Sequence, residues 1–340
     1  MLPYFELTAL DRQFFGDHLQ ARLPQRVFDA HVHLNLADHV KSVPRERILS
    51  DFAMQICTTL PVEDAYACAA ALYPGISYEI AGMGWPIREA DLRGNNCYLA
   101  QAARTGRVRP FMVVQPGWPL DEIDAGLAEN GFVGLKPYPD MLVGVKGAEV
   151  SLFDFLPHEH WRLAERYRKA VLLHLGRKER LSDPNNIREL LQARQAYPSV
   201  TIIIAHFGRS FCPVYLREGL DQLGEADFYF DTAAVTNPEV YDVAFDRIPR
   251  NRILYGSDMP VLFFHGRQEW HGRSYRVLCR EHFPFNEGSH RPAQEEAQYT
   301  LFLYEQMRSI LDAMDRHGFS DEDREAFFWT NAVQALNVKA

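Results

Sequence analysis

The chain has 340 residues, 47% hydrophobic and 24% charged, and this ordinary globular composition excludes a wholly disordered protein. Its 36 basic and 45 acidic side chains give a formal net charge of −9, which argues against nucleic acid or an anionic membrane as the main partner. No apolar run approaches the roughly 18 residues that span a bilayer, and the five cysteines form no CxxC pair, so we expect a cytoplasmic protein with reduced thiols.

In chain order, a helical arm over residues 1–25 precedes short apolar runs that alternate with segments of helical spacing. The predicted strands are 26–33, 53–60, 109–115, 132–138, 170–175, 200–206, 227–232 and 252–258. Several are nearly continuous apolar runs, which are typical of parallel strands covered on both faces. Residues 122–129, 161–169, 187–196, 293–316 and 321–337 have the apolar spacing of helices.

Eight strands that alternate with helices predict a (β/α)₈ barrel. We expect one domain over residues 1–340, with the barrel core at about 26–260 and C-terminal helices over 293–337. The structural alternative is a doubly wound open sheet, which is disfavoured because no GxGxxG motif follows the first strand.

Two long segments, 73–96 and 260–292, interrupt this pattern. Loops that follow barrel strands lie on the catalytic face, so we expect these insertions to cover it. The second carries His265, His271, His282 and His290, whose spacing matches no recognised metal geometry. A lid with solvated polar side chains is therefore favoured over a second metal site.

Five side chains that can bind a metal ion stand at the ends of predicted strands. His31 and His33 are two residues apart and so point to the same side of the first strand. His174, His206 and Asp258 each end an apolar run, at the edge where a barrel places its catalytic groups. A lone strand histidine is more often a hydrogen-bonded core residue, but this ordered set on one face predicts a shared metal site, with Zn²⁺ as the default ion.

The other histidines are not assigned to this site. His158 and His160 open a predicted helix, on which residues two apart diverge by about 200°, so they are expected at the surface or in a helix cap. His18, His39 and His317 are also expected at the surface.

The loops at the strand ends supply candidates for substrate contacts, namely Trp118, Tyr138, Arg177 and Arg209. Arginine beside a metal favours a small carboxylate-bearing substrate, because its guanidinium can pair with a carboxylate in a bidentate way. The alternative for each residue is a surface ion pair or a core aromatic.

Seven motifs together resemble the amidohydrolase superfamily, and in particular its metal-dependent hydrolases and decarboxylases related to aminocarboxymuconate semialdehyde decarboxylase. The motifs are DAHVH (29–33), GFVGLKPYP (131–139), VLLHLG (171–176), IIAHFGRS (203–210), YFDTAA (229–234), LYGSDMP (254–260) and WTNAVQAL (329–336). The resemblance covers about residues 26–260 and the last helix, and it is specific for the fold and the metal site but not for the substrate.

The resemblance implies that His31, His33, His174 and Asp258 bind one divalent ion, Zn²⁺ first, with Mn²⁺ or Fe²⁺ as alternatives. It also implies that Asp258 acts as the general base, taking a proton from the metal-activated water. His206 is implied to stand beside the ion and to hydrogen-bond the substrate carbonyl or the attacking water.

Lys136 ends the fourth predicted strand, where binuclear members of the superfamily carry a carbamylated lysine that bridges two metals. The context GLKPYP resembles the mononuclear branch more closely. We therefore predict one metal and an unmodified Lys136 that faces a substrate carboxylate or pairs with an acid.

The predicted activity is metal-dependent hydrolysis of a small carbonyl or carboxylate compound. Non-oxidative decarboxylation with the same ligands is the alternative, since no residue in the sequence separates the two reactions. A non-catalytic scaffold is disfavoured because every ligand position holds a competent residue. The aromatic-rich C-terminal helices suggest a homodimer.

Overall fold

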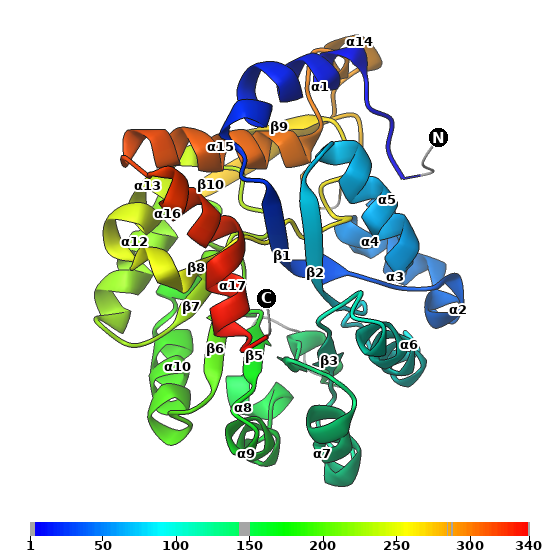
Figure 1. Cartoon of the computed structure of the whole chain (residues 1–340), viewed down its shortest axis with the longest axis vertical. Coiled ribbons are helices and arrows are strands. Elements are labelled where there is room, and N and C mark those ends of the chain that lie inside the picture. Colours follow the sequence, from blue (N-terminus) through cyan, green and yellow to red (C-terminus); the bar gives the residue numbers. More distant parts are fainter. Residues whose placement is uncertain (1–3, 143–149, 284, 287, 339–340) are drawn as a thin grey trace.

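Parallel strands form the centre of the molecule, and helices surround them (Figure 1). This computed structural model describes residues 4–142, 150–283, 285–286 and 288–338. The central strands are β1 (Arg26–His33), β2 (Ser77–Met83), β3 (Phe111–Val113), β4 (Gly134–Lys136), β5 (Ala170–Leu173), β6 (Thr201–Ile204), β7 (Tyr229–Asp231) and β8 (Ile253–Leu254).

The strands follow one another around a ring. Strands β3 to β8 pair in chain order in one parallel sheet, and β1 pairs with β2 in a second. Backbone hydrogen bonds join the two sheets at both ends, from Arg109 to Ile80 O and from His33 to Met259 O, at 2.9 and 2.8 Å. This arrangement confirms the predicted α/β barrel class, in which side chains fill the interior and helices cover the outside.

The helices alternate with the strands as predicted. Those between β1 and β8 are α2 (Ala37–Val40), α3 (Arg45–Ser50), α4 (Phe52–Ile56), α5 (Val62–Leu72), α6 (Leu92–Arg104), α7 (Leu120–Glu129), η3 (Pro139–Met141), α8 (Leu152–Phe155), α9 (His158–Arg166), η4 (Arg180–Ser182), α10 (Pro184–Ala196), α11 (His206–Arg209), α12 (Pro213–Leu223), α13 (Pro238–Arg247) and η5 (Arg250–Arg252). None of the described helices combines the length and the apolar character that crossing a membrane requires.

The second predicted strand was placed wrongly. Residues 53–60 contain most of the short helix α4, which Asp51 caps by accepting hydrogen bonds from the backbone of Ala53 and Met54. The true second strand, β2, lies in the segment 73–96 that was predicted as a loop. It pairs with β1 from Arg26 opposite Ser77 to His33 opposite Met83, with an irregularity between Asp29 and Val32. Long-range pairing with β1, rather than local composition, makes this segment a strand.

The segment after β8 also contains regular structure that the sequence did not predict. An antiparallel hairpin joins β9 (Gly266–His271) to β10 (Ser274–Cys279). The predicted helix 293–316 is two helices, α14 (Ala293–Glu296) and α15 (Phe302–Arg316). Between them the chain turns to bond with the N-terminal arm, because Leu301 N donates to the buried carboxylate of Asp11 at 2.7 Å. The closing helix follows as α16 (Asp321–Glu325), η6 (Ala326–Thr330) and α17 (Asn331–Ala335).

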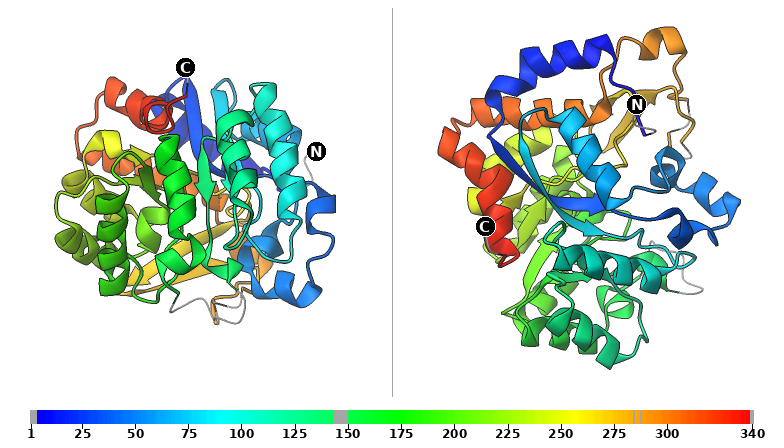
Figure 2. Two further views of the ribbon diagram at one scale, coloured as in Figure 1. Left: turned by 90° about the horizontal axis from the view of Figure 1, so that it is seen from below. Right: turned by 45° about the vertical axis from the view of Figure 1, so that its right-hand side comes forward.

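The predicted N-terminal arm is helical, with α1 (Ala9–Phe14), η1 (Phe15–Leu19) and η2 (Gln20–Arg22). It lies beside α15, as the right-hand view of Figure 2 shows, and the rings of Phe14 and Tyr304 stack with centroids 6.4 Å apart. The arm therefore covers a C-terminal helix of the barrel.

Two of the histidines expected at the surface are buried. His39 lies 3.0 Å from the Asn95 amide, and His160 faces inward from α9. His158 begins α9 as predicted, and His18 is exposed. His317 is half-buried in ion pairs with acidic residues of α13.

Candidate active site

A cavity of about 400 Å³ opens where the strands end at their carboxyl termini. Eight residues predicted for the site line it together: His31, His33, Lys136, Tyr138, His174, His206, Arg209 and Asp258. They come from β1, β4, β5, β6 and β8 or from the residues directly after these strands. The parallel arrangement explains the convergence, because the carboxyl ends of all barrel strands meet on one face.

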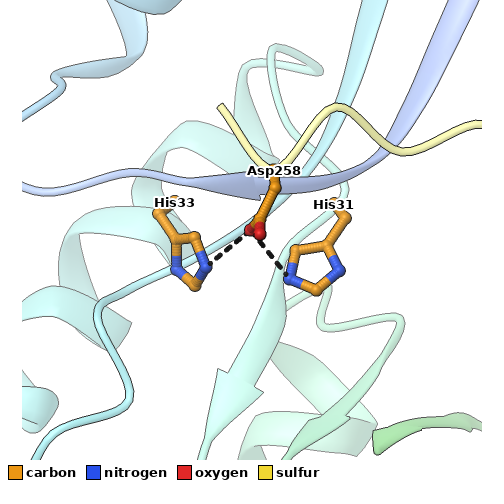
Figure 3. Close-up of side chains that lie close together, drawn as sticks. All are labelled: His31, His33 and Asp258. Carbon is orange, nitrogen blue, oxygen red and sulfur yellow. Dashed lines mark ion pairs between the residues drawn. The ribbon is translucent and has the colours of Figure 1, made fainter. Parts of the chain in front are cut away.

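His31, His33 and Asp258 form a compact buried group (Figure 3). One carboxylate oxygen, Asp258 Oδ1, lies 3.2 Å from His33 Nε2 and 3.5 Å from His31 Nε2. The three ligand atoms all lie within 4.8 Å of one another. Two imidazoles and a carboxylate are ligands that Zn²⁺ and similar divalent ions accept.

The second nitrogen of each of these imidazoles is already engaged. His31 Nδ1 lies 2.9 Å from Asp231 Oδ2, and His33 Nδ1 lies 3.4 Å from the Gly84 carbonyl oxygen. Both partners are acceptors, so a neutral ring that donates to its partner carries the proton on Nδ1 and presents the lone pair of Nε2 to Asp258. The indole of Trp85 stacks on the His33 ring at 4.3 Å and fixes its plane.

This geometry fits a cation. Asp258 Oδ1 is buried and has no hydrogen-bond partner among the described residues, because the two imidazole nitrogens that it faces are acceptors in this tautomer. A buried carboxylate oxygen without a donor is costly. A divalent ion between the three atoms would remove that cost, so the residues present suit a metal centre.

His206 lies beside this group. Its ring centroid is 5.0 Å from that of His31 and 5.2 Å from that of His174. His206 Nδ1 donates to the Ala233 carbonyl at 2.8 Å, which leaves Nε2 unprotonated. The backbone φ angles of His206 and Asp258 are 57° and 63°, a left-handed conformation that is strained for these residues. Such strain at two strand ends indicates a functional constraint on both side chains.

His174, which the resemblance implied as a ligand, is not among the three residues of the compact group. Its Nε2 lies 3.5 Å from the Tyr138 hydroxyl. It nevertheless lines the same cavity, and its ring centroid is 5.2 Å from that of His206.

Burial controls the protonation of the site. It lowers the pKa of His31, His174 and His206, which favours the neutral imidazole that binds metals. Burial alone would raise the pKa of Asp258, but the surrounding imidazoles outweigh it and keep this pKa below the ordinary aspartate value. Burial also lowers the pKa of Lys136 to about 8, and its Nζ lies 3.5 Å from His31 Nε2.

Two buried aspartates, Asp29 and Asp231, hold the first strand in place. The sequence patterns did not identify them as site residues. Asp231 ends β7, binds His31 Nδ1 and accepts the backbone N–H of His206 at 2.7 Å. Asp29 Oδ1 accepts the backbone N–H groups of His31 and Ser257 at 3.1 and 2.9 Å. Asp231 ends an apolar strand as Asp258 does, so the same signal could have identified it.

Arg209 is the arginine that reaches the cavity. Its Nη1 donates to the carbonyl oxygens of Leu175 and Gly176 at 3.2 and 3.1 Å, which fixes the guanidinium. No carboxylate of the described residues lies within 4.0 Å of it. This half-buried cation therefore has room for an anionic partner.

Arg177 and Trp118 do not line the cavity. Arg177 forms a buried ion pair with Glu189 at 2.8 Å, which uses the guanidinium for structure. Trp118 donates to Gln115 at 2.9 Å and lies under the guanidinium of Arg93. The structure therefore does not bring these two side chains to the cavity with the other predicted site residues.

Aromatic side chains build the remaining walls, and most come from segments that the sequence analysis treated as loops. They are Phe52, Trp85, Phe211, Phe264, Tyr275, Phe285 and Phe302. Tyr275 lies on the β9–β10 hairpin together with Val277, and Gln268 faces them from the opposite strand. The hairpin is therefore a wall of the cavity, with charged side chains on its outer face, rather than only a solvated lid.

Residues 28–338 match the family described as Amidohydrolase, and the chain belongs to this family. It is an enzyme of the amidohydrolase type, and its buried His-His-Asp group suits a divalent metal. No curated protein sequence matches the chain significantly.

Several solved structures share the fold at low sequence identity. One is a probable 2-pyrone-4,6-dicarboxylic acid hydrolase from Acinetobacter baumannii with bound citric acid (16% identity, TM-score 0.56, covering 92% of this chain and 99% of that chain). Another is 5-carboxyvanillate decarboxylase from Sphingomonas paucimobilis, with 12% identity and a TM-score of 0.56, covering 93% of this chain and 100% of that chain. A third is a dihydroxybenzoic acid decarboxylase from Polaromonas sp. JS666 with bound manganese and an inhibitor. It has 16% identity and a TM-score of 0.52, covering 93% of this chain and 97% of that chain.

Proposed function

We propose that this protein is a metal-dependent hydrolase that acts on a small carbonyl compound carrying a carboxylate. The observation that supports it best is the buried Asp258 oxygen, which has no donor among the described residues and faces the unprotonated Nε2 atoms of His31 and His33. His174, neutral and on the same cavity wall, is the proposed fourth ligand. Zn²⁺ is the proposed ion, with Mn²⁺ or Fe²⁺ as alternatives, and one ion per chain is expected.

A bound divalent ion supplies a Lewis acid that lowers the pKa of a coordinated water towards about 7. Asp258 has a second oxygen, Oδ2, which can take a proton from the attacking water and pass it to the leaving group. His206 presents an unprotonated Nε2, so it is suited to accept a hydrogen bond from that water rather than to donate one to the substrate carbonyl. Of the two roles that the sequence left open for His206, we therefore propose the contact with the attacking water.

The substrate is proposed to be oriented by Arg209, the arginine that lines the cavity. The guanidinium of Arg209, anchored by two backbone carbonyls and without a described carboxylate beside it, is the proposed partner of a substrate carboxylate. Lys136 and Tyr138 lie on the same wall and are proposed to contact the substrate near the reacting carbon.

Non-oxidative decarboxylation is the second candidate reaction. The aromatic walls formed by Phe211, Tyr275 and Phe285 favour it, because they suit the flat ring of an aromatic acid. Two of the similar structures carry the names of decarboxylases that act on such acids.

The test is to assay the metal-loaded protein with a pyrone dicarboxylate and with a hydroxylated benzoate, and to follow ring opening and CO₂ release in parallel. Ring opening without CO₂ supports the hydrolase, and CO₂ from the benzoate supports the decarboxylase. Protein stripped with a chelator is the control and should be inactive until metal is restored. If the protein binds no divalent metal, both proposed reactions are wrong, and the non-catalytic scaffold is the remaining hypothesis.

A further inference from the structure

Helix α15, which crosses the upper part of Figure 1, inserts one amide side chain between the ends of β7 and β8. Gln306 is fully buried, and its Nε2 donates to the carbonyl oxygens of Thr232 and Gly256 at 2.7 and 3.0 Å. Both partners are acceptors only, so the orientation of the amide is fixed by chemistry. Gln306 therefore connects the two strands by hydrogen bonds that no apolar side chain could make.

These bonds lie where the main-chain pairing stops. The ladder between β7 and β8 ends at Asp231 opposite Leu254. Beyond it, the Thr232 hydroxyl donates to Gly256 O at 3.1 Å and accepts from Gly256 N at 3.0 Å. Gln306 adds its two hydrogen bonds to the same residues, Thr232 and Gly256. Side chains therefore connect β7 and β8 where their backbone ladder has ended.

The segments held in this way carry the candidate metal centre. Asp231, which fixes His31 Nδ1, directly precedes Thr232, and Asp258 follows Gly256 by two residues. Gly256 also packs against His31 so closely that a β-carbon there would lie 3.0 Å from the His31 β-carbon. A shift of either segment would therefore move His31 or Asp258.

We propose that Gln306 is a positioning residue that holds His31 and Asp258 at metal-binding distance from outside the cavity. Gln306 does not line the cavity and touches neither ligand, so it acts through the backbone of Thr232 and Gly256. This inference rests on the proposed function, because it requires that the site binds a metal. Groups that orient metal ligands typically change metal affinity by about 10–100-fold when they are removed.

The chain contains a matched control at the other end of β8. Asn331 on α17 is buried, and its Nδ2 donates to the carbonyl oxygens of Arg250 and Ile253 at 2.8 and 2.9 Å. Its amide likewise donates to two carbonyl oxygens, but both lie at or just before the start of β8, and Asn331 does not line the cavity. Replacement by leucine removes the donors at either position and keeps similar volume.

The experiment compares wild type, Gln306→Leu and Asn331→Leu by calorimetric titration of the metal-free proteins with Mn²⁺ and by urea unfolding. Both variants should lose stability, but only Gln306→Leu should weaken Mn²⁺ binding, by about 10-fold or more. Gln306→Met keeps the length of the side chain and should show the same loss, which covers the case in which the leucine variant does not fold.

The outcomes are distinguishable. Wild type that does not bind Mn²⁺ would contradict the proposed function itself. Wild-type affinity in Gln306→Met or Gln306→Leu, or an equal loss of affinity in Asn331→Leu, would overturn the positioning role and reduce Gln306 to a structural residue.

Discussion

Replacement of Asp11 should destabilise the protein more than any other change in the N-terminal arm. The carboxylate is fully buried and accepts five hydrogen bonds, from Thr8 N and Oγ1, Thr300 Oγ1, Leu301 N and His265 Nε2, at 2.7 to 2.9 Å. It thereby ties the arm to the segment that connects the hairpin to α15. Asp11→Ala leaves these donors without an acceptor.

The expected loss of unfolding free energy follows from the buried donors that Asp11→Ala leaves without an acceptor. Removing one partner of a buried charged network typically costs about 3–5 kcal/mol, because the remaining polar groups stay desolvated. We expect a loss in this range for Asp11→Ala. Asp17→Asn is the control, since Asp17 lies in the same arm but is exposed and bonds only Gln13 among the described side chains, at 3.3 Å. An exposed change of this kind should stay within about 0.5 kcal/mol of wild type.

The effect should also depend on pH. Burial raises the pKa of Asp11, but the bonds from His265, Thr8 and Leu301 outweigh it and hold this pKa below its ordinary value. A depressed folded-state pKa contributes stability above the unfolded-state value of about 3.9, and this contribution is lost as pH falls. The difference between wild type and Asp11→Ala should therefore be full at pH 7 and shrink below about pH 4. Urea unfolding followed by tryptophan fluorescence measures both. A loss under 1 kcal/mol at pH 7, or a difference that grows towards acid pH, would refute this account.

The other predictions concern the candidate metal centre. Purified protein should contain close to one divalent metal per chain by elemental analysis, and His31→Ala with His33→Ala should abolish it; wild-type metal content in that double variant would contradict the ligand assignment. Lys136 should carry no carbamate in native intact-mass analysis with bicarbonate present, whereas a carbamate with two metals would reverse the expectation of one ion. Asp258→Asn should nearly eliminate activity with only partial loss of metal, because the amide keeps one oxygen ligand but cannot act as a base. His206→Asn should keep its metal and lose roughly two to three powers of ten in rate, and an emptied site would instead make His206 a ligand.

The barrel class could be predicted from the sequence, and so could most of the polar residues that line the cavity. His31 and His33 share a side of β1 because side chains alternate along any strand. His174, His206 and Asp258 are recognisable because each is a polar residue at the end of an apolar run, which is a local property. The convergence of these strand ends follows from the parallel topology alone.

Which of the remaining residues share the cavity depends on long-range contacts in the folded chain. Arg177 and Arg209 look alike in the sequence, but Glu189 pairs with the first and no described carboxylate pairs with the second. The location of β2 depends on hydrogen bonds to β1, so it could not be read from its own residues. The amide of Gln306 reaches backbone carbonyls 74 and 50 residues away. Such partners are set by long-range packing, and no local sequence pattern encodes them.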